Sequence, residues 1–570
     1  MRGLMAAGPA LDRDHMALYN CSFVTLDNPR AFDEILYILT CGTGVGFSCE
    51  NQFVNKLPEI AEEFHDTDTT IVVSDSRIGW GSSFRELIQL LYGGKIPKFD
   101  VSRIRAKGER LRTFGGRASG PDPLVELFNY CVRVFRGAAG RKLTDIETHG
   151  IVCKIGEVVV VGGVRRSALI SLSDRHSQRM RTAKSGNWWE RFPEFALANN
   201  SAVYDEKPGV GEFLEEWSSL YESKSGERGI YYRAGIRNKT DRIGRRDSSL
   251  ILGTNPCGEI ALRNAGLCNL TEIVVRSGDT LENLKRKARI ATILGTIQST
   301  YTDFRYVRNV WRRNAEEERL LGVSLTGIYD NRTLSGTDEG SDGEAQGNLR
   351  ATLEELKEYC GNINKEYSEK LGISPSVAIT TVKPSGTVSQ LVDSASGIHP
   401  RHSAYYIRSI RQDNKDPLTQ FLKDSGVPSE PDVTKPDATT VFYFPIKAPD
   451  GAVTRDQVTP RSHLDLWNVY NKHWAEHQVS VTVSVGEEQW VDTAGWVYDN
   501  FEDLSGVSFL PLDLGTYRQA PYQECNAEQY EALVSKMPES LDWEKFSSYE
   551  TDDNTTSTQQ LACVSGVCEI

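Results

Sequence analysis

The sequence has no long hydrophobic run and no excess of positive charge. No stretch approaches the roughly 18 consecutive apolar residues that a membrane-spanning helix requires. The opening residues, MRGLMAAGPALDRDHM, are interrupted by charge before the apolar region of a signal peptide forms. The formal net charge is −13, which argues against nucleic acid or an anionic membrane as the main partner. We therefore expect a cytoplasmic protein whose partners include neither nucleic acid nor a membrane.

A disulfide framework and a metal-ligand pattern are also missing. The 570 residues include 11 cysteines, and an odd number in a chain without an export signal indicates thiols in a reducing compartment. The last two, Cys563 and Cys568, have no second Cys or His pair beside them, so they make a poor zinc site. We expect no metal ion held by protein side chains.

The C-terminal segment has few groups that can build a core. SSYETDDNTTSTQQ precedes the final LACVSGVCEI, and its polar composition cannot bury enough surface to fold alone. Cysteine is usually buried or reactive, so two thiols on a mobile tail suggest a carrier that moves a disulfide from one place to another.

Short β-rich apolar runs alternate with longer helical patterns along the rest of the chain. This alternation favours a parallel or mixed sheet enclosed by helices, so the predicted fold class is α/β. The even spread of strands indicates one large barrel-like unit. Predicted strands cover residues 69–74, 157–163, 376–382, 439–446 and 479–485, and predicted helices cover 281–304 and 348–371.

A glycine-rich segment, CGTGVGFSC (residues 41–49), resembles a dinucleotide-binding loop only superficially. It does not match GxGxxG, and it lacks the expected strand–helix context. We interpret Gly42, Gly44 and Gly46 as positions where another part of the backbone approaches closely.

The segment TNPCGEIALRNAGLCNLTEI (residues 254–273) carries the strongest chemical pattern. Asn255, Cys257 and Glu259 are two residues apart, so in an extended backbone they share one face. An amide, a thiol and a carboxylate on one face combine a hydrogen-bond donor, a sulfur reagent and a general base. Spacing alone does not separate this interpretation from an ordinary Pro-Cys-Gly turn.

Several motifs resemble ribonucleotide reductases, in particular the adenosylcobalamin-dependent (class II) monomeric type. NPCGEI resembles the active-site finger loop of that family, and LCNLTEI follows it. Others occur in the family's order: AAGPALDRDHMALYNCSF, FGGRASGPDPL, GGVRRSA, TVKPSGTVSQL with GIHP, and LACVSGVCEI. The resemblance covers nearly the whole chain. It implies a ten-stranded α/β barrel with a central finger loop over residues 1–545, effector-related elements at roughly 69–170, and a flexible redox tail over 546–570.

The resemblance also implies roles for individual residues. Cys257 corresponds to the thiyl-radical cysteine that removes hydrogen from the ribose 3′ carbon. Glu259 corresponds to the base that takes the 3′-hydroxyl proton, and Asn255 to a hydrogen-bonding partner of the substrate hydroxyls. Cys21 and Cys268 correspond to the pair that delivers two electrons and ends as a disulfide.

Further residues match the family's redox tail and nucleotide-binding segments. Cys563 and Cys568 match the tail dithiol that re-reduces the buried pair and is itself reduced by thioredoxin or a similar protein. The segment KPSGTVSQL follows a predicted strand and leads into a possible helix, a setting that suits phosphate. The family match assigns to the substrate phosphates Pro384, Ser385, Gly386 and Thr387. Arg165 and Arg166, in GGVRRSA, match the loop that relays effector identity.

The source of the radical is the main alternative within this resemblance. A class I catalytic subunit needs a partner protein and relays the radical through adjacent tyrosines on a late strand. The corresponding segment here, SGVSFLPLD (residues 505–513), contains no tyrosine. This favours adenosylcobalamin as the cofactor. A non-catalytic nucleotide-binding protein or thiol–disulfide carrier is a further alternative, but a carrier needs neither Glu259 nor a phosphate segment.

The resemblance further implies the substrate and partners. We expect a ribonucleoside triphosphate as substrate, with diphosphate left open, a dNTP or ATP effector, and a monomer or weak dimer. The interval between Cys21 and Cys257 looks short for the family, so we expect the inserted effector-binding subdomain to be reduced.

Overall fold

Parallel strands with helices between them form one half of a barrel. The computed structural model describes residues 8, 11–109, 118–160, 168–338, 342–433, 435–512, 519–549, 563–564 and 567–568. Neighbouring strands in this half are all parallel, and they run in the order β1 (Cys21–Thr25), β2 (Gly44–Ser48), β5 (Leu169–Asp174), β6 (Ala198–Tyr204) and β7 (Gly229–Tyr232).

Five more strands form the opposing half. Strand β18 (Gly506–Pro511) is antiparallel to β7 and parallel to β17 (Thr482–Val485). A second parallel sheet contains β11 (Leu270–Val274), β12 (Gly322–Thr326) and β13 (Thr380–Thr381).

Two links join the sheets into a ring. A parallel bridge between Val382 and Val479 connects the end of β13 to the residues before β17. On the other side, β10 (Gly266–Cys268) pairs with β1 and continues through Asn269 into β11. The strand order therefore agrees with the ten-stranded α/β barrel that the sequence predicts.

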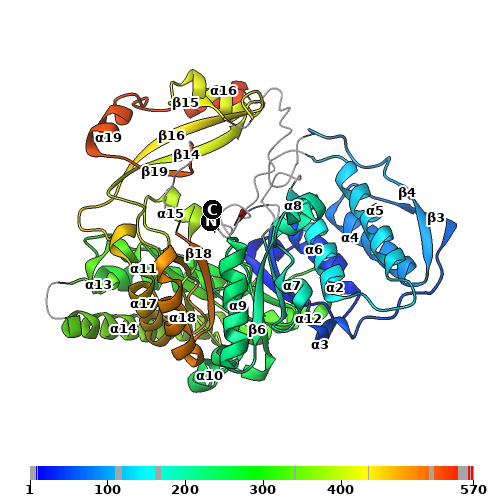
Figure 1. Cartoon of the computed structure of the whole chain (residues 1–570), viewed down its shortest axis with the longest axis horizontal. Helices are drawn as coiled ribbons and strands as arrows, with labels where there is room; N and C mark the ends of the chain where they lie inside the picture. Colours follow the sequence, from blue (N-terminus) through cyan, green and yellow to red (C-terminus); the bar gives the residue numbers. More distant parts are fainter. Residues whose placement is uncertain are drawn as a thin grey trace.

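Amphipathic helices cover the outside of the barrel (Figure 1). The predicted helix at 348–371 forms part of a longer helix, and its Leu349, Leu353 and Leu356 are fully buried at helical spacing. The covering helices are α2 (Arg30–Thr40), α6 (Asp145–Val160), α9 (Val210–Ser223), α10 (Arg233–Ile243), α11 (Leu281–Gln298), α12 (Asn309–Glu318), α14 (Asp342–Leu371), α17 (Pro460–His473) and α18 (Trp490–Asp499).

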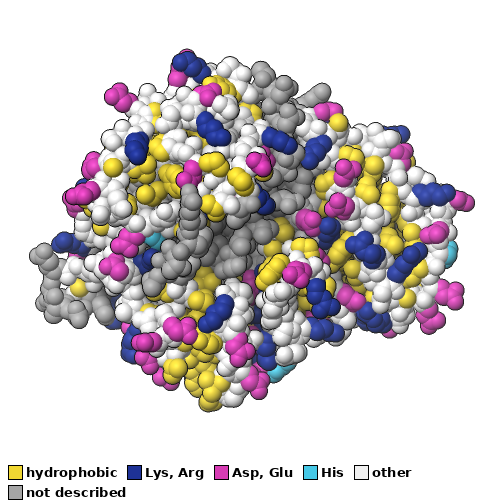
Figure 2. All heavy atoms as spheres, turned by 45° about the horizontal axis from the view of Figure 1, so that its top comes forward, with side chains coloured by type: hydrophobic (Ala, Val, Ile, Leu, Met, Phe, Trp, Pro, Cys, Tyr) yellow, Lys and Arg dark blue, Asp and Glu magenta, His cyan; other side chains and the backbone are white. Residues whose placement is uncertain are grey.

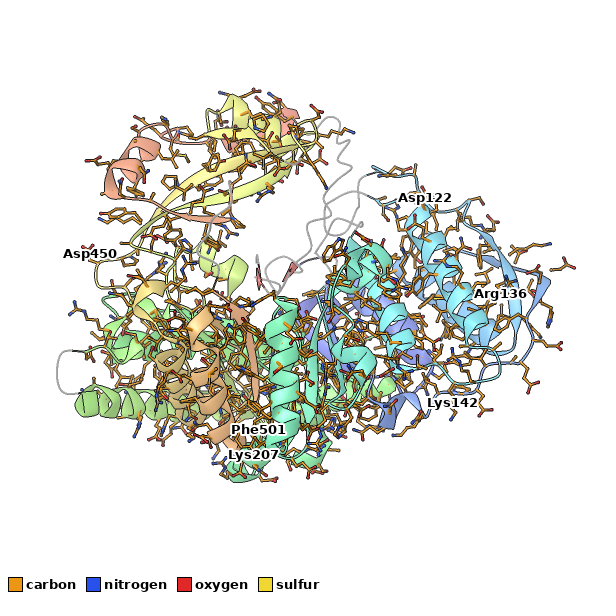
Figure 3. The ribbon with its side chains drawn as sticks, viewed as in Figure 1. Asp122, Arg136, Lys142, Lys207, Asp450 and Phe501 are labelled. Carbon is orange, nitrogen blue, oxygen red and sulfur yellow. The ribbon has the colours of Figure 1, made fainter. Side chains whose placement is uncertain are left out.

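Two lobes extend from the barrel (Figure 1). Figure 3 labels Asp122 and Arg136 near the two ends of α5 in the first lobe, and Asp450 where the chain returns from the second. The first lobe contains α3 (Asn51–Val54), β3 (His65–Val72), α4 (Arg77–Tyr92), β4 (Lys95–Asp100) and α5 (Asp122–Gly137). The second contains β14 (Tyr405–Asp413), α16 (Pro417–Asp424), β15 (Ser429–Pro431), β16 (Thr439–Lys447), β19 (Tyr522–Glu524), α19 (Ala527–Val534) and α20 (Phe546–Tyr549).

The remaining elements are short. They are α7 (Gln178–Arg181), α8 (Trp188–Arg191), β8 (Ile251–Thr254), β9 (Ala261–Arg263), α13 (Arg332–Ser335), α15 (Gly386–Leu391), β20 (Cys563–Val564) and β21 (Val567–Cys568). On the face shown in Figure 2, acidic and basic side chains are interspersed. No helix among the described residues has the length and apolarity to cross a membrane.

The structure corrects two of the predicted strands. Residues 157–160 form the last turn of α6, where Val158 and Val159 pack into the core, so tertiary packing overrides the β propensity of a valine run. Of the predicted strand 376–382, only Thr380–Thr381 and the bridge at Val382 pair with neighbours. The ordered chain also extends past residue 545, because Phe546 and Tyr549 pack on Phe421.

Candidate active site

A buried hairpin inside the barrel carries the finger loop. Strands β8 and β9 pair antiparallel and flank residues 255–260. Glycines in β2 make room for the hairpin: a Cβ on Gly46 would lie 1.9 Å from the Thr254 carbonyl oxygen, and one on Gly44 would lie 3.1 Å from Pro256 Cγ. The close backbone approach predicted for this segment is therefore present at Gly46, whereas Gly44 leaves room for the side chain of Pro256.

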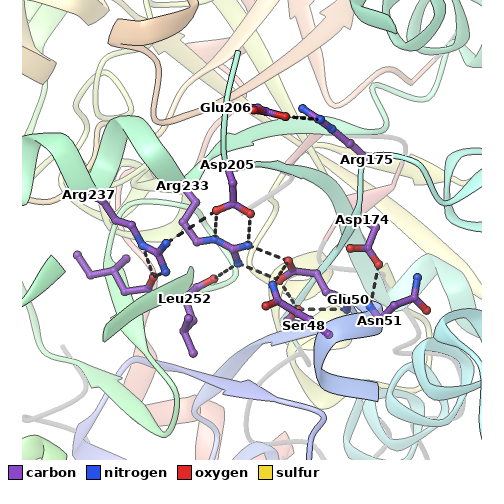
Figure 4. Close-up of polar contacts among 12 residues, drawn as sticks. Ser48, Glu50, Asn51, Asp174, Arg175, Asp205, Glu206, Arg233, Arg237 and Leu252 are labelled. Atoms are coloured by element: carbon purple, nitrogen blue, oxygen red, sulfur yellow. Dashed lines mark hydrogen bonds and ion pairs between the residues drawn. The ribbon is translucent and has the colours of Figure 1, made fainter. Parts of the chain in front are cut away.

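A buried arginine network holds the base of the hairpin (Figure 4). Arg233, at the start of α10, is bound by Glu50 at 2.9 Å and by Asp205 at 2.6 Å. The same guanidinium donates to the Leu252 carbonyl oxygen at 3.1 Å, and Arg237 donates to the Ile251 carbonyl oxygen at 3.1 Å. These contacts tie β8 to the residues that follow β2, β6 and β7.

The tip of the loop is fixed by hydrogen bonds to the opposite half of the barrel. The Glu259 carbonyl oxygen accepts bonds from the Thr381 hydroxyl at 2.7 Å and from the Gln478 backbone N–H at 3.0 Å. The Ser480 hydroxyl donates to the Cys257 carbonyl oxygen at 2.5 Å. Within the loop, the Asn255 amide donates to the Glu259 carboxylate at 2.6 Å.

The three predicted loop residues differ in exposure. Asn255 and Glu259 are fully buried, whereas Cys257 is half-buried. The pKa of Glu259 is raised to about 7: burial is the largest cause and charge on Cys21 adds to it, whereas Lys383 and the hydrogen bond from Asn255 act in the opposite direction. A carboxyl that titrates near neutrality can both accept and release a proton at working pH.

Cys21 and Cys268 face each other across two neighbouring strands. They are directly opposite in the antiparallel pairing of β1 with β10, and both are fully buried. Burial raises the pKa of Cys268 well above its ordinary value, and the neighbouring Cys21 thiol raises it further. The structure thus brings together two thiols that lie far apart in the sequence, beside Glu259.

The predicted phosphate segment lies at the end of β13. Gly386 begins helix α15, and Ser385 precedes it. Within the described part of the chain, the fully buried Ser385 hydroxyl has no hydrogen-bond partner. Pro384 and the backbone of Thr387 complete the segment, so backbone N–H groups and one unpartnered hydroxyl gather where a phosphate is predicted.

Some predicted residues lie where the structure describes little. Arg165 and Arg166 lie outside the described residues. For Cys563 and Cys568 only the backbone is described, and β20 and β21 pair so that these two residues are opposite each other. His399, in the GIHP motif, uses both ring nitrogens: one contacts the Ser396 carbonyl oxygen and the other the Thr482 backbone N–H.

Sequence reasoning missed two charged residues of the site. Lys383 immediately precedes the phosphate segment, and Glu272 lies four residues after Cys268; both stand inside motifs that carry the resemblance. Their position within these motifs was the available signal. In the described ranges, no group of three Cys, His, Asp or Glu side chains has a metal-binding arrangement.

Comparisons with known proteins show which proteins this chain is similar to. A model described as "B12-dependent ribonucleotide reductase, insertion domain" matches residues 50–135. This range contains the first lobe up to Phe135, so the first lobe is similar to that insertion domain. The expected reduction of this subdomain stays a prediction.

Curated relatives are similar over almost the whole chain. An adenosylcobalamin-dependent ribonucleoside-triphosphate reductase of Euglena gracilis is 29% identical, over 100% of this chain and 77% of its own length. A protein of the same name from Lactobacillus gasseri is 27% identical, over 95% of this chain and 79% of its own.

Solved structures share the fold. The crystal structure of a B12-dependent (class II) ribonucleotide reductase aligns with a TM-score of 0.79 at 24% identity, over 94% of this chain and 84% of the other. The class Id ribonucleotide reductase alpha subunit of Actinobacillus ureae aligns with a TM-score of 0.51 at 10% identity, over 87% and 84%. The matched insertion domain and the near-complete similarity to curated reductases show that this chain is similar to B12-dependent (class II) ribonucleotide reductases.

Proposed function

We propose that this protein reduces ribonucleoside triphosphates to 2′-deoxyribonucleotides for DNA synthesis, by thiyl-radical chemistry with adenosylcobalamin. One observation carries the proposal: the buried dithiol Cys21–Cys268 lies beside the loop of Cys257 and Glu259. Two electrons and two protons from a dithiol, and one 2′-hydroxyl from a ribose, give a deoxyribose, a disulfide and water.

Each residue of the site then has one role. Cys257, as a thiyl radical, takes the 3′ hydrogen and returns it at the end. Glu259 accepts the 3′-hydroxyl proton, and Asn255 holds the substrate hydroxyls. Cys21 and Cys268 supply the proton that leaves with the 2′-hydroxyl as water and the hydrogen that takes its place at the 2′ carbon, and their sulfurs join in a disulfide. Burial excludes water from these groups, which protects a radical from side reactions.

The residues around Cys257 fit adenosylcobalamin. Cys257 is half-buried and can be approached, unlike the fully buried thiols behind it. Polar side chains occupy one face of the segment that runs from Ser480 through β17. The Ser480 hydroxyl donates to the Cys257 carbonyl oxygen, and the polar side chains become more exposed along β17. The described side chains that would line the bound cofactor are Ser480, Thr482, Ser484 and Ser508. When bound, the cofactor supplies the radical that Cys257 takes up.

Three further roles complete the proposal. Pro384, Ser385, Gly386 and Thr387 bind the substrate phosphates. A dNTP or ATP effector acts through the first lobe and the loop of Arg165 and Arg166. Cys563 and Cys568 re-reduce the buried dithiol and are themselves reduced by thioredoxin or a similar protein.

Anaerobic turnover tests the proposal. The full chain with adenosylcobalamin and a small dithiol is expected to convert CTP and ATP to deoxynucleotides, with CDP and ADP run in parallel to decide the phosphate preference. Cys257→Ser should abolish product, whereas Cys525→Ser, a half-buried thiol outside the barrel, should retain it. Turnover that needs a second protein and ignores the cobalamin would contradict the proposal and indicate a class I subunit.

A further inference from the structure

A row of polar residues crosses the second half of the barrel at the level of the finger loop. The strand register places Glu272 of β11 opposite Ser324 of β12, and Ser324 opposite Thr381 of β13. The Thr381 hydroxyl binds the Glu259 carbonyl oxygen, so this row faces the loop. Its residues therefore lie next to the predicted chemistry.

Lys383 follows this row along the same chain segment. Its backbone N–H donates to the Ser324 hydroxyl at 2.8 Å, and its ammonium lies 3.8 Å from the Glu272 carboxylate. Val382, between Thr381 and Lys383, is buried in the core outside the barrel. In an extended backbone this places Thr381 and Lys383 on the inner face.

The backbone at Lys383 has little freedom to move. A Cβ on Gly397, which has a φ of +56°, would lie 2.4 Å from the Lys383 carbonyl oxygen. Only 19% of the lysine side chain and 11% of the Glu272 side chain are exposed. The ammonium group of Lys383 is therefore a largely buried charge close to Glu272.

That charge lies within reach of the reacting groups. Burial disfavours the Lys383 ammonium, yet its pKa is raised, because Glu272, Cys257, Glu259 and Cys21 all favour the charged form. The interaction is mutual, and Lys383 accordingly lowers the pKa of Glu259. Among the described residues, the titratable groups that act on Glu259 include Cys21 on β1, Cys268 on β10 and Lys383 after β13.

We propose that Lys383 is a positioning residue, whose ammonium, beside Glu272, favours the ionised form of Glu259. This inference rests on the proposed function and assigns a role to a residue outside the predicted site. The competing role for Lys383 is a phosphate ligand, because the phosphate segment begins at the next residue.

The two roles give different pH behaviour in the full chain. Lys383→Gln removes the positive charge, so the rising limb of kcat/KM against pH should move upward by about one pH unit. Lys383→Arg keeps the charge and should restore the wild-type limb. Lys370→Gln removes an exposed lysine of α14 and should change nothing. If Lys383→Gln does not fold, Lys383→Met takes its place in the comparison, because this change removes the charge but keeps the apolar part of the side chain.

A second measurement works without turnover. The rate of Cys257 alkylation by iodoacetamide, followed by mass spectrometry across pH, should show a higher midpoint in Lys383→Gln than in the wild type, because the charges of Lys383 and Cys257 interact. If the wild-type chain does not reduce nucleotides, the proposed function fails and this midpoint alone decides the role of Lys383.

Two results would overturn the inference. A raised KM for the triphosphate with unchanged pH profiles would make Lys383 a phosphate ligand. If the pH profile of kcat/KM and the alkylation midpoint are unchanged while thermal stability falls, the role of Lys383 is purely structural.

Discussion

At the scale of single residues, the site combines full burial with ionisable groups. Glu259 is the clearest case, because its pKa is raised from 4.5 to about 7 chiefly by burial. The folded chain therefore binds this proton more tightly than the unfolded chain does. The contribution of Glu259 to stability is complete below the unfolded value of 4.5 and is lost as pH rises through about 7.

Glu259→Gln separates activity from stability. Turnover should be abolished, because the base is gone. At pH 8, the free energy of unfolding should rise by on the order of 3 kcal/mol, since no buried carboxylate has to be ionised. At pH 5 the gain should be much smaller. Thermal unfolding of both proteins at the two pH values checks this, and an equal gain at both would refute it.

Wild-type activity should itself rise with pH through about 7.

At the scale of elements, the hairpin β8–β9 depends on small residues in the barrel wall. Gly46 allows the Thr254 carbonyl oxygen to approach the β2 backbone more closely than any side chain would permit. The network around Arg233 fixes the other end of the same hairpin (Figure 4). These contacts hold the loop at its base and along its length, and they therefore fix the position of Cys257 within the barrel.

Gly46→Ala should displace the hairpin. The added methyl group would overlap the Thr254 carbonyl oxygen, so we expect a loss of about 1–3 kcal/mol in stability and a fall in turnover of at least about tenfold. Gly361→Ala is the matched control, because its Cβ meets nothing within 4 Å inside helix α14. That change should gain up to about 1 kcal/mol and leave turnover unchanged. Denaturant titration and a turnover assay would show whether the two variants differ in this way.

At the scale of the whole molecule, the buried dithiol needs a route by which it is re-reduced, and we propose that the C-terminal cysteine pair provides it. Cys21 and Cys268 are enclosed by the barrel, so a protein reductant cannot reach them directly. A dithiol at the end of the chain can enter, exchange disulfides and return.

Replacing both tail cysteines tests the proposal that the tail re-reduces the buried dithiol. A pre-reduced chain with Cys563→Ser and Cys568→Ser should make roughly one deoxynucleotide per molecule and then stop when thioredoxin is the only reductant. The wild-type chain should continue. Sustained turnover of the double variant at the wild-type rate would exclude the shuttle. Product per chain, measured by rapid quench, distinguishes the two results.

Features that depend on local interactions were predictable from the sequence, whereas features that depend on contacts between distant segments were not. The leucines of α14 were predictable from local helical spacing, and the proximity of Asn255 to Glu259 was predictable because both lie in one contiguous motif. The run at 157–160 was wrongly predicted as a strand, because its valines pack as part of a helix that the local pattern does not reveal. Lys383 and Glu272 were missed because they meet only through the pairing of neighbouring strands.

The sequence by itself determined which chemical groups are present, their order along the chain and the α/β character of the fold. Only the tertiary structure decided that Cys21 lies opposite Cys268, that Cys257 alone of these three thiols can be approached, and that Glu259 titrates near neutrality. The reason is physical: exposure and pKa depend on burial and neighbouring charge, and segments far apart in the chain supply both.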